Sequence, residues 1–401
     1  MKKLVCLILL FVFISANATE TRVRGLGSIG NYIDDDSNIY IFPGRLSFYQ
    51  NLSILEMNTS SSTGSALVTY HNAEKNLDIG LVVNRPTSIY YFDYDNYPRT
   101  NSSTLNRLLI GKNNKVFFVG ADYDYSDAKD ISYWGDRQTS NLNTQVGFGL
   151  TTQSEKPLDF SCVVNYSIIG KESRNNDYDP SRHTTDSGKI INPELRLRYS
   201  KDSFIGKIRP YIYLSAKYGE LDTKEGNSEG IISNDILLSA IDAEFGFVYE
   251  KKINPRTDLW VGLIPASYSY GLIEGNEIFN SYSDPSTTLR YSTDEIEKYF
   301  SSSFFFAAES KLKNWFTARA SFRSWFPFTH SEVVSGNDAL TSTYNAMFDH
   351  YYEVNYGFSV YHKGFAMDCT FNPEILYNGP NVITGQHTSQ LVSHISVLYQ
   401  W

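Results

Sequence analysis

The last nine residues, Ser393-His394-Ile395-Ser396-Val397-Leu398-Tyr399-Gln400-Trp401, decide the fold of this chain. Counted back from Trp401, every second residue is apolar or aromatic, and the residues between them are polar, with Leu398 as the one break. Successive side chains of a β-strand point to opposite faces, so this alternation predicts a strand with one apolar face and one polar face.

A terminal aromatic residue within such a strand resembles the closing strand of bacterial outer-membrane β-barrels. In that family, the barrel-insertion machinery reads the closing strand and its last aromatic residue. The resemblance implies an all-β, transmembrane antiparallel barrel in the cell outer membrane, in contact with outer-membrane lipids, with Trp401 as part of the insertion signal. A soluble β-sandwich is the alternative, and it requires no terminal aromatic strand.

The N-terminus predicts export. Met1-Lys2-Lys3 is a short positive region, residues 4–14 form an apolar run, and Ala16-Asn17-Ala18 is a small-residue cleavage site. This pattern predicts a secretory signal peptide over residues 1–18, too short to be a membrane-spanning helix. The mature chain is then expected to start at Thr19.

The bulk composition agrees with a barrel. The mean hydropathy is −0.32 and the chain has 30 tyrosines and 25 phenylalanines; barrels need only alternating apolar residues and aromatic girdles. A net charge of −9 leaves no basic footprint, so we expect no nucleic-acid partner. Beyond the predicted signal, Cys162 and Cys369 fall in the apolar register of their strands and are predicted to be free and lipid-facing.

Candidate strands follow at hairpin spacing, and their connections alternate between short and long. Short connections near residues 154–156, 201–203, 254–256, 313–314 and 362–364 alternate with long ones at 169–187, 220–232, 271–296, 331–346 and 379–387. Short periplasmic turns and long outer loops are typical of this class, which predicts both termini in the periplasm. Counting the weak segment at 105–111 gives sixteen crossings.

The predicted register directs a set of charged residues into the lumen, because an Arg or Lys at the lipid midplane costs about 2–4 kcal/mol. Two interpretations stay open: ion pairs between the adjacent strands at 205–219 and 233–250 that make a filled lumen rigid, or opposed charges that orient a permeating solute. The candidate residues are Arg196, Arg198, Lys207, Arg209, Lys217, Asp242, Glu244, Arg319 and Arg323.

Residues 19–44 resemble the N-terminal segment of the FadL-like long-chain fatty acid transporters and their PorV-like relatives. Gly25-Leu26-Gly27, the acidic turn Asp34-Asp35-Asp36 and Pro43-Gly44 match that family in order, although Phe42-Pro43-Gly44 replaces its Asn-Pro-Ala. The resemblance implies a plug-like segment at 19–44 inside a barrel at 45–401. It also implies fourteen strands, which we expect in preference to sixteen if the weak segment does not cross.

If the segment is a plug, Gly25 and Gly27 would allow close approach to the wall. The three aspartates would then meet lumen arginines at positions 196, 198, 209, 319 and 323. The alternative is a flexible periplasmic leader that contacts nothing, but the segment has more apolar residues than such a leader would need.

Two function classes compete. The resemblance implies a transporter that admits a small, hydrophobic or amphipathic solute through a plugged lumen. The other class is a structural or assembly barrel whose filled lumen passes nothing and whose outer loops bind a partner; long, polar connections at 169–187 and 271–296 suit contacts in either case.

We expect no enzyme, cofactor or metal. An EF-hand loop starting at Asp34 would need Gly and Glu where the chain has Ile39 and Arg45. None of the histidines lies in a recognisable nucleophile motif, but sequence spacing leaves open a Ser/His pair assembled across strands.

Overall fold

The computed structural model describes residues 19–28, 30–58, 63–92, 98–129, 136–152, 156–174, 183–204, 206–226, 230–281, 288–336, 340–344, 348–371 and 392–401. The predicted signal peptide lies outside the described residues. Within them, no helix has the length and apolar character needed to cross a membrane.

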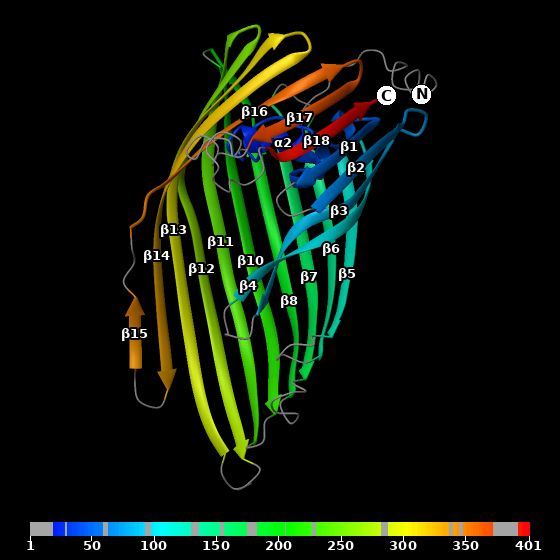
Figure 1. Cartoon of the computed structure of the whole chain (residues 1–401). Helices are drawn as coiled ribbons and strands as arrows, with labels where there is room; N and C mark the ends of the chain where they lie inside the picture. The colour runs from blue at the N-terminus through cyan, green and yellow to red at the C-terminus, as the bar shows by residue number, and fades with distance from the viewer. Residues whose placement is uncertain are drawn as a thin grey trace, which may run out of the picture.

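The described chain is one antiparallel sheet closed into a barrel (Figure 1). Its strands are β1 Leu52–Asn58, β2 Thr63–Asn72, β3 Leu77–Phe92, β4 Pro98–Lys112, β5 Lys115–Lys129, β6 Asp136–Thr151, β7 Leu158–Arg174, β8 His183–Tyr199, β9 Lys201–Ser203, β10 Gly206–Gly226, β11 Gly230–Asn254, β12 Thr257–Ser281, β13 Thr288–Lys313, β14 Phe316–Gly336, β15 Leu340–Tyr344, β16 Tyr351–His362, β17 Phe365–Phe371 and β18 Val392–Gln400.

The C-terminal strand closes the barrel, as its pattern predicts. β18 pairs with β17 on one side and with β1 on the other, in a register that runs from Leu52 opposite Gln400 to Asn58 opposite His394. The backbone amide of Trp401 donates to the Asn51 carbonyl at 3.0 Å. Closure removes the open edges whose unpaired backbone groups would be costly in lipid.

The barrel wall has sixteen strands in the described residues, so the expectation of fourteen is wrong. Of the eighteen strands, β9 continues the line of β8 and β15 pairs only with the C-terminal end of β14, which leaves 18 − 2 = 16. The weak segment lies in β4 and pairs with both neighbours, with Leu109 opposite Gly80 and Phe118. Its alternation is hidden because its lumen face carries Leu105 and Leu109 as well as Arg107.

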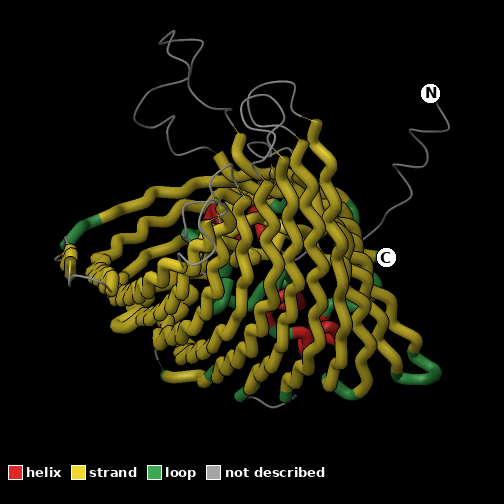
Figure 2. Tube along the Cα trace, turned by 90° about the horizontal axis from the view of Figure 1, so that it is seen from below, coloured by secondary structure: helices red, strands yellow, loops and turns green. Residues whose placement is uncertain are grey.

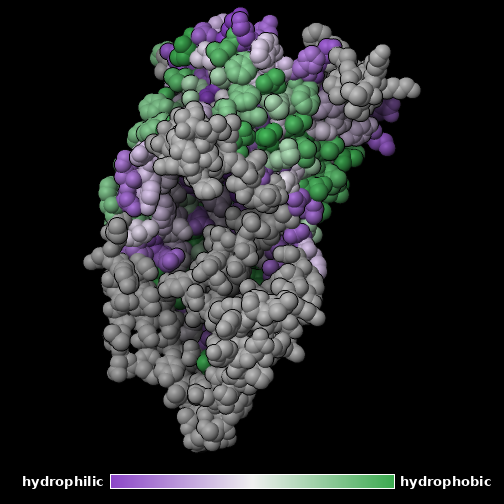
Figure 3. Space-filling view, in the orientation of Figure 1, coloured by the Kyte–Doolittle hydropathy of each residue, from purple (hydrophilic) through white to green (hydrophobic). Residues whose placement is uncertain are grey.

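The outward face is apolar, which makes the wall a membrane-spanning one. Exposed apolar residues recur at every second position, for example Phe117 and Val119 on β5. Figure 3 shows apolar residues gathered in the upper half of one face, with hydrophilic residues above them. The barrel therefore fits the outer membrane, where lipid-facing and lumen-facing residues alternate.

The predicted short turns near 254–256, 313–314 and 362–364 are confirmed, whereas residues 201–203 form β9 and the turn near 154–156 lies mostly outside the described residues. The predicted long connections are largely strand where they are described, and the one at 379–387 lies outside the described residues. β12 and β13, for example, run through most of residues 271–296. A strand of about 9–11 residues is enough to cross a bilayer, whereas these have 25 and 26 residues. Backbone pairing continues beyond the apolar band, where polar side chains on both faces obscure the period of two.

The cysteines are free, as predicted. On β17, Asp368 and Thr370 reach residues inside the lumen, so Cys369 between them points outward. The wall begins later than the predicted residue 45, because Pro43–Phe48 forms a 3₁₀-helix and β1 begins only at Leu52.

Candidate functional site in the barrel lumen

The chain before β1 lies inside the ring of strands, which we call the N-terminal segment (residues 19–48) (Figure 2). It forms α2 (Glu20–Gly25), α3 (Asn38–Ile41) and the 3₁₀-helix η1 (Pro43–Phe48). Thr19 caps α2, since its hydroxyl accepts from the Arg22 amide at 3.4 Å, and Pro43 starts η1, where its missing N–H costs nothing. α2 contacts β14 and β16 to β18, and η1 contacts β3 to β7.

Hydrogen bonds fix α2 to the wall. The Thr19 hydroxyl donates to Asp368 on β17 at 2.8 Å, and the Thr370 hydroxyl donates to the Thr21 carbonyl at 2.6 Å. Arg22 bonds Glu309 on β13 at 2.7 Å. These bonds join residues roughly 290–350 positions apart, so they hold only when the barrel has closed.

Asp34 lies among four cations. Its carboxylate accepts from Arg209 at 2.7 Å and pairs with Arg45 at 2.9 Å, Arg198 at 3.5 Å and Lys207 at 3.7 Å. Burial alone would raise the pKa of this carboxyl, but the four cations, led by Arg209, hold the pKa well below its usual range. Opposite charges stabilise the ionised form when they lie this close.

Arg198 on β8 is the centre of this network and is fully buried. Its guanidinium bonds Asp159 on β7 at 2.9 Å, donates to the Ile33 carbonyl at 2.6 Å and to the Asn38 side chain at 2.9 Å, and lies over the Phe42 ring. One arginine thus binds a wall carboxylate and three groups of the N-terminal segment.

Apolar contacts complete the attachment. One core cluster joins Ile39, Tyr40 and Leu46 of the segment to lumen-facing wall residues that include Leu398. The residue that breaks the alternation of the C-terminal strand therefore belongs to the apolar core that the wall forms with the segment. A second cluster packs Phe42 and other segment residues against β10 to β13.

The segment backbone touches the wall at Gly44. A Cβ atom there would lie 2.5 Å from the Leu150 carbonyl carbon, and a Cβ on Gly149 would lie 2.5 Å from the Gly44 nitrogen. Gly25 is similarly close to the Arg319 side chain, and Gly27 has a φ of +81°. Small residues are thus required where the segment meets β6 and β14.

The three aspartates have different surroundings, so the expectation that all of them meet lumen arginines is only partly right. Asp34 does, whereas Asp35 pairs at 2.8 Å with Arg22 of its own segment. The Asp36 carboxylate is buried with no hydrogen-bond partner among the described residues. Burial first, and then Asp35 and Asp368 nearby, raise the pKa of Asp36 well above its usual range.

The other candidate lumen residues form separate pairs. Arg196 pairs with Glu194, Lys217 with Asp242 at 2.7 Å, and Arg319 with Asp368 at 3.0 Å, while Glu244 accepts from Tyr32 at 2.9 Å. Arg209 also pairs with Glu250, which confirms that the basic strand meets the acidic one. Arg323 lies against the Trp325 ring. The pairs Arg196–Glu194 and Lys217–Asp242 lie within the wall.

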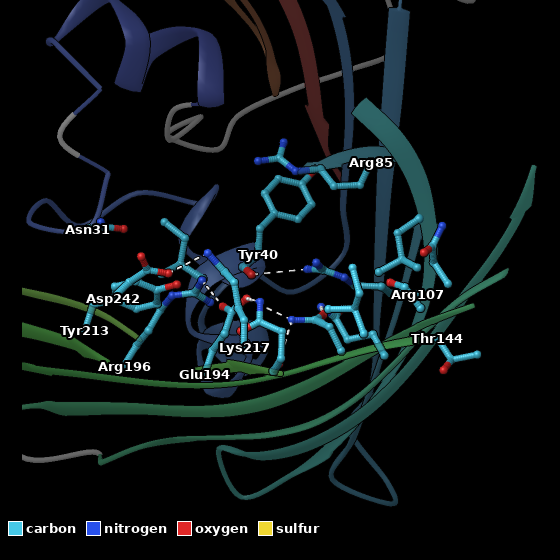
Figure 4. A pocket seen from close by; sticks show the side chains of 18 of the residues that line it. Asn31, Tyr40, Arg85, Arg107, Thr144, Glu194, Arg196, Tyr213, Lys217 and Asp242 are labelled. Atoms are coloured by element: carbon cyan, nitrogen blue, oxygen red, sulfur yellow. Dashed lines mark hydrogen bonds and ion pairs between the residues drawn. The ribbon is translucent and has the colours of Figure 1, made fainter. Parts of the chain in front are cut away.

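A cavity of about 550 Å³ lies between the N-terminal segment and the wall (Figure 4). Tyr40 and Ile41 of the segment border it, and wall strands on both sides supply charged, amide and tyrosine side chains. This volume is in the range of small-molecule sites. The lining residues are Asn31, Tyr40, Ile41, Arg85, Leu105, Arg107, Asn143, Thr144, Gln145, Asn165, Ser167, Ile190, Asn192, Glu194, Arg196, Tyr211, Tyr213, Lys217, Asp242 and Glu244.

One serine and one histidine do meet across strands. The Ser324 hydroxyl lies 2.7 Å from His350 Nε2. Ser324 is 1% exposed, and no described carboxylate contacts the histidine ring. A nucleophile needs access to its substrate, so we interpret the pair as structural. The described residues also contain no cluster of three or more His, Cys, Asp or Glu side chains that could hold a metal ion.

Several residues of the network were not predicted from the sequence. Arg45, which lies in the segment, pairs with Asp159 on the wall. Two more wall carboxylates bind the segment: Glu309 binds Arg22, and Asp368 binds Thr19. For Asp159 and Asp368 a signal existed, since both occupy lumen positions in alternating strands. Arg45 carried no such signal, because the expected strand boundary placed it at the start of the wall.

No protein-family model and no curated protein matches the sequence. Solved structures do match. A FadL homologue from Pseudomonas aeruginosa has a TM-score of 0.40 at 10% identity, covering 97% of this chain and 99% of that one.

The toluene transporter TbuX from Ralstonia pickettii has a TM-score of 0.38 at 11% identity, covering 94% and 97% of the two chains. The ferric yersiniabactin uptake receptor FyuA from Yersinia pestis has a TM-score of 0.39 at 6% identity, covering 88% and 80%. The FadL homologue belongs to the group that the N-terminal segment resembles. At TM-scores below 0.5 these matches carry no information about what the chain binds.

Acid is expected to loosen the N-terminal segment through Asp34. Its folded pKa lies below the unfolded value of about 4, so its contribution to docking is complete above that pH and declines as the pH falls further. Asp36 acts in the opposite sense, because its folded pKa is raised and acid favours the docked state. We expect channel conductance to rise as the pH falls from 5 to 3. The part of this rise that comes from protonation of Asp34 should be absent in Asp34→Asn.

The Asp34→Asn variant is the control for this experiment, since Asp36 contributes equally to both proteins. Conductance in planar bilayers is measured from pH 7 to pH 3. Identical pH profiles for wild type and Asp34→Asn would contradict the assignment.

Proposed function

We propose that this chain is a transport barrel of the outer membrane that admits a small amphipathic solute past its N-terminal segment, which acts as a plug. The cavity between the segment and the wall carries this proposal. It has tyrosine and aliphatic side chains, among them Tyr211, Tyr213 and Ile190, beside amides and charges. A mixed lining suits a solute that is amphipathic rather than purely hydrophobic.

We also propose that both termini lie in the periplasm and that the strand ending at Trp401 engages the insertion machinery. The short turn at Gly364 lies beside the C-terminus, since the Gln400 amide donates to the Gly364 carbonyl at 3.0 Å. Short turns of this class face the periplasm. Trp401 is stacked on Tyr399 and half-exposed, so it is accessible for recognition.

The second candidate function is a structural barrel with a filled lumen that binds partners through its outer strands. The two apolar clusters and the ion network around Arg198 favour it, because they fill the end of the lumen nearest the termini. In this case the cavity does not lead to a passage through the barrel.

Liposome swelling separates the two functions. Purified mature protein is reconstituted at pH 7, and swelling is followed with arabinose, with gluconate and with decanoate. Transport predicts uptake of at least one of these probes above that of protein-free liposomes. No uptake of any probe by a heat-modifiable, folded barrel would overturn the transport proposal in favour of the structural one.

A further inference from the structure

Four cations line the cavity, and they differ in whether a carboxylate pairs with them. Arg85 pairs with Glu20 and Glu56. Arg196 pairs with Glu194, and Lys217 pairs with Asp242. Arg107 on β4 contacts no carboxylate in the described structure. Its guanidinium donates to the Tyr40 carbonyl at 3.3 Å, and its Nε has no partner among the described residues.

The amides beside Arg107 are also unsatisfied. Asn143 on β6 is 5% exposed, and neither its oxygen nor its nitrogen has a hydrogen-bond partner among the described residues. Gln145, two residues on, is 6% exposed; it donates to Asn165 at 2.5 Å, but its oxygen has no partner there. Buried polar groups in folded proteins are nearly always hydrogen-bonded, so these atoms must bind whatever fills the cavity.

The carboxylates on the opposite wall of the cavity have hydrogen-bond donors within the protein. Glu194 accepts from Asn165 at 2.9 Å and from Asn192 at 3.2 Å, and Asp242 accepts from Ser269 at 2.6 Å. Figure 4 shows Arg107 on one side of the cavity and Glu194 and Asp242 on the other. The free hydrogen-bonding capacity and the unpaired positive charge are therefore on the same side.

We infer that the cavity is a binding site for a small hydroxylated carboxylate, whose anionic end binds Arg107 and whose hydroxyl groups bind Asn143 and Gln145. A guanidinium can hold a carboxylate through two parallel hydrogen bonds, and free amide oxygen and nitrogen atoms match hydroxyls that both donate and accept. This inference deepens the proposed function, since it names the class of the transported solute.

Calorimetry on the folded mature protein in detergent tests the site. The probes are gluconate, glucose as its uncharged counterpart, and decanoate as a carboxylate without hydroxyls. Because a hydrogen bond to a charged group is the stronger kind, we expect gluconate to bind wild type about tenfold more tightly than glucose. Arg107→Gln should abolish that difference, and Arg107→Lys should keep part of it.

Two further variants make the result specific. Lys112→Gln removes a cation from the exposed end of the same strand and should leave all affinities unchanged. Asn143→Leu should weaken gluconate and glucose alike, because it removes the amide and leaves the charge. The heat-modifiable gel shift confirms that each variant is folded.

The inference is overturned if gluconate binds wild type no better than glucose, if Arg107→Gln binds gluconate as wild type does, or if decanoate binds more tightly than gluconate. Binding in detergent is independent of passage. Gluconate binding at Arg107 with no uptake of any probe by liposomes would keep the site and reject transport. Uptake of a probe, together with gluconate binding that Arg107→Gln leaves unchanged, would keep transport and reject the site.

Discussion

Deletion of residues 19–43 is expected to raise the single-channel conductance of the folded barrel several-fold. The deletion removes α2, which contacts β14 and β16 to β18 inside the lumen, and α3; η1, which contacts β3 to β7, loses only Pro43. The wall keeps its own ladder of hydrogen bonds, including the closure of β18 on β1. The barrel should therefore survive the loss of the segment.

The same deletion should shift ion selectivity towards anions. Residues 19–43 contain four acids and two arginines, so their removal takes a net charge of −2 from the lumen. It also leaves Arg198, Lys207 and Arg209 without Asp34. Reversal potentials in a salt gradient measure this shift.

A matched control replaces residues 19–43 by a Gly/Ser chain of equal length. A flexible chain lacks the ion pairs and the apolar contacts, so this variant should also conduct more than wild type, although less than the deletion. Unchanged conductance in a heat-modifiable deletion mutant would show that the segment does not limit passage.

Substitution of Arg198 by Met should release the segment while leaving the wall intact. The change leaves Asp159 with Arg45 as its remaining arginine partner. It also removes the arginine donor from the Ile33 carbonyl and from the Asn38 oxygen, which keeps only the Asp35 amide at 3.3 Å. Breaking a buried ion pair by removing one partner costs about 3–5 kcal/mol. That loss is large enough to change the docked fraction of the segment.

Trypsin reports this release, since Arg22 and Arg24 are protected inside the lumen in the docked state. Arg198→Met should be cleaved there much faster than wild type. Arg196→Met is the control, because Arg196 faces the same lumen two residues away but pairs with Glu194 and not with the segment. Equal protection of the two variants would refute the central role of Arg198.

The sequence by itself determined the class of fold. Alternation in residues 393–401 predicts the strand that closes the barrel, and the alternation of charged with apolar residues on β8, β10, β11 and β14 predicts the side facing the lumen. These inferences hold because each depends only on the alternation of side chains between the two faces of one strand. Neighbouring strands do not change that alternation.

The tertiary structure alone decided the strand number and the partners within the lumen. The segment at 105–111 reads as weak because its lumen face is partly apolar, and that face is apolar because the N-terminal segment packs nearby. Leu398 breaks its pattern for the same reason. A local pattern records which face a side chain takes, but not what lies inside the closed barrel.

The partners of the acidic turn show the same limit. Asp34, Asp35 and Asp36 are consecutive, yet one meets four cations, one meets Arg22 and one is buried without a described partner. Arg196 and Arg107 cannot be distinguished by residue type either, since one is neutralised by Glu194 and the other is not. Charge pairing joins strands that are far apart in the chain, so only the closed barrel sets the distances that select each pair.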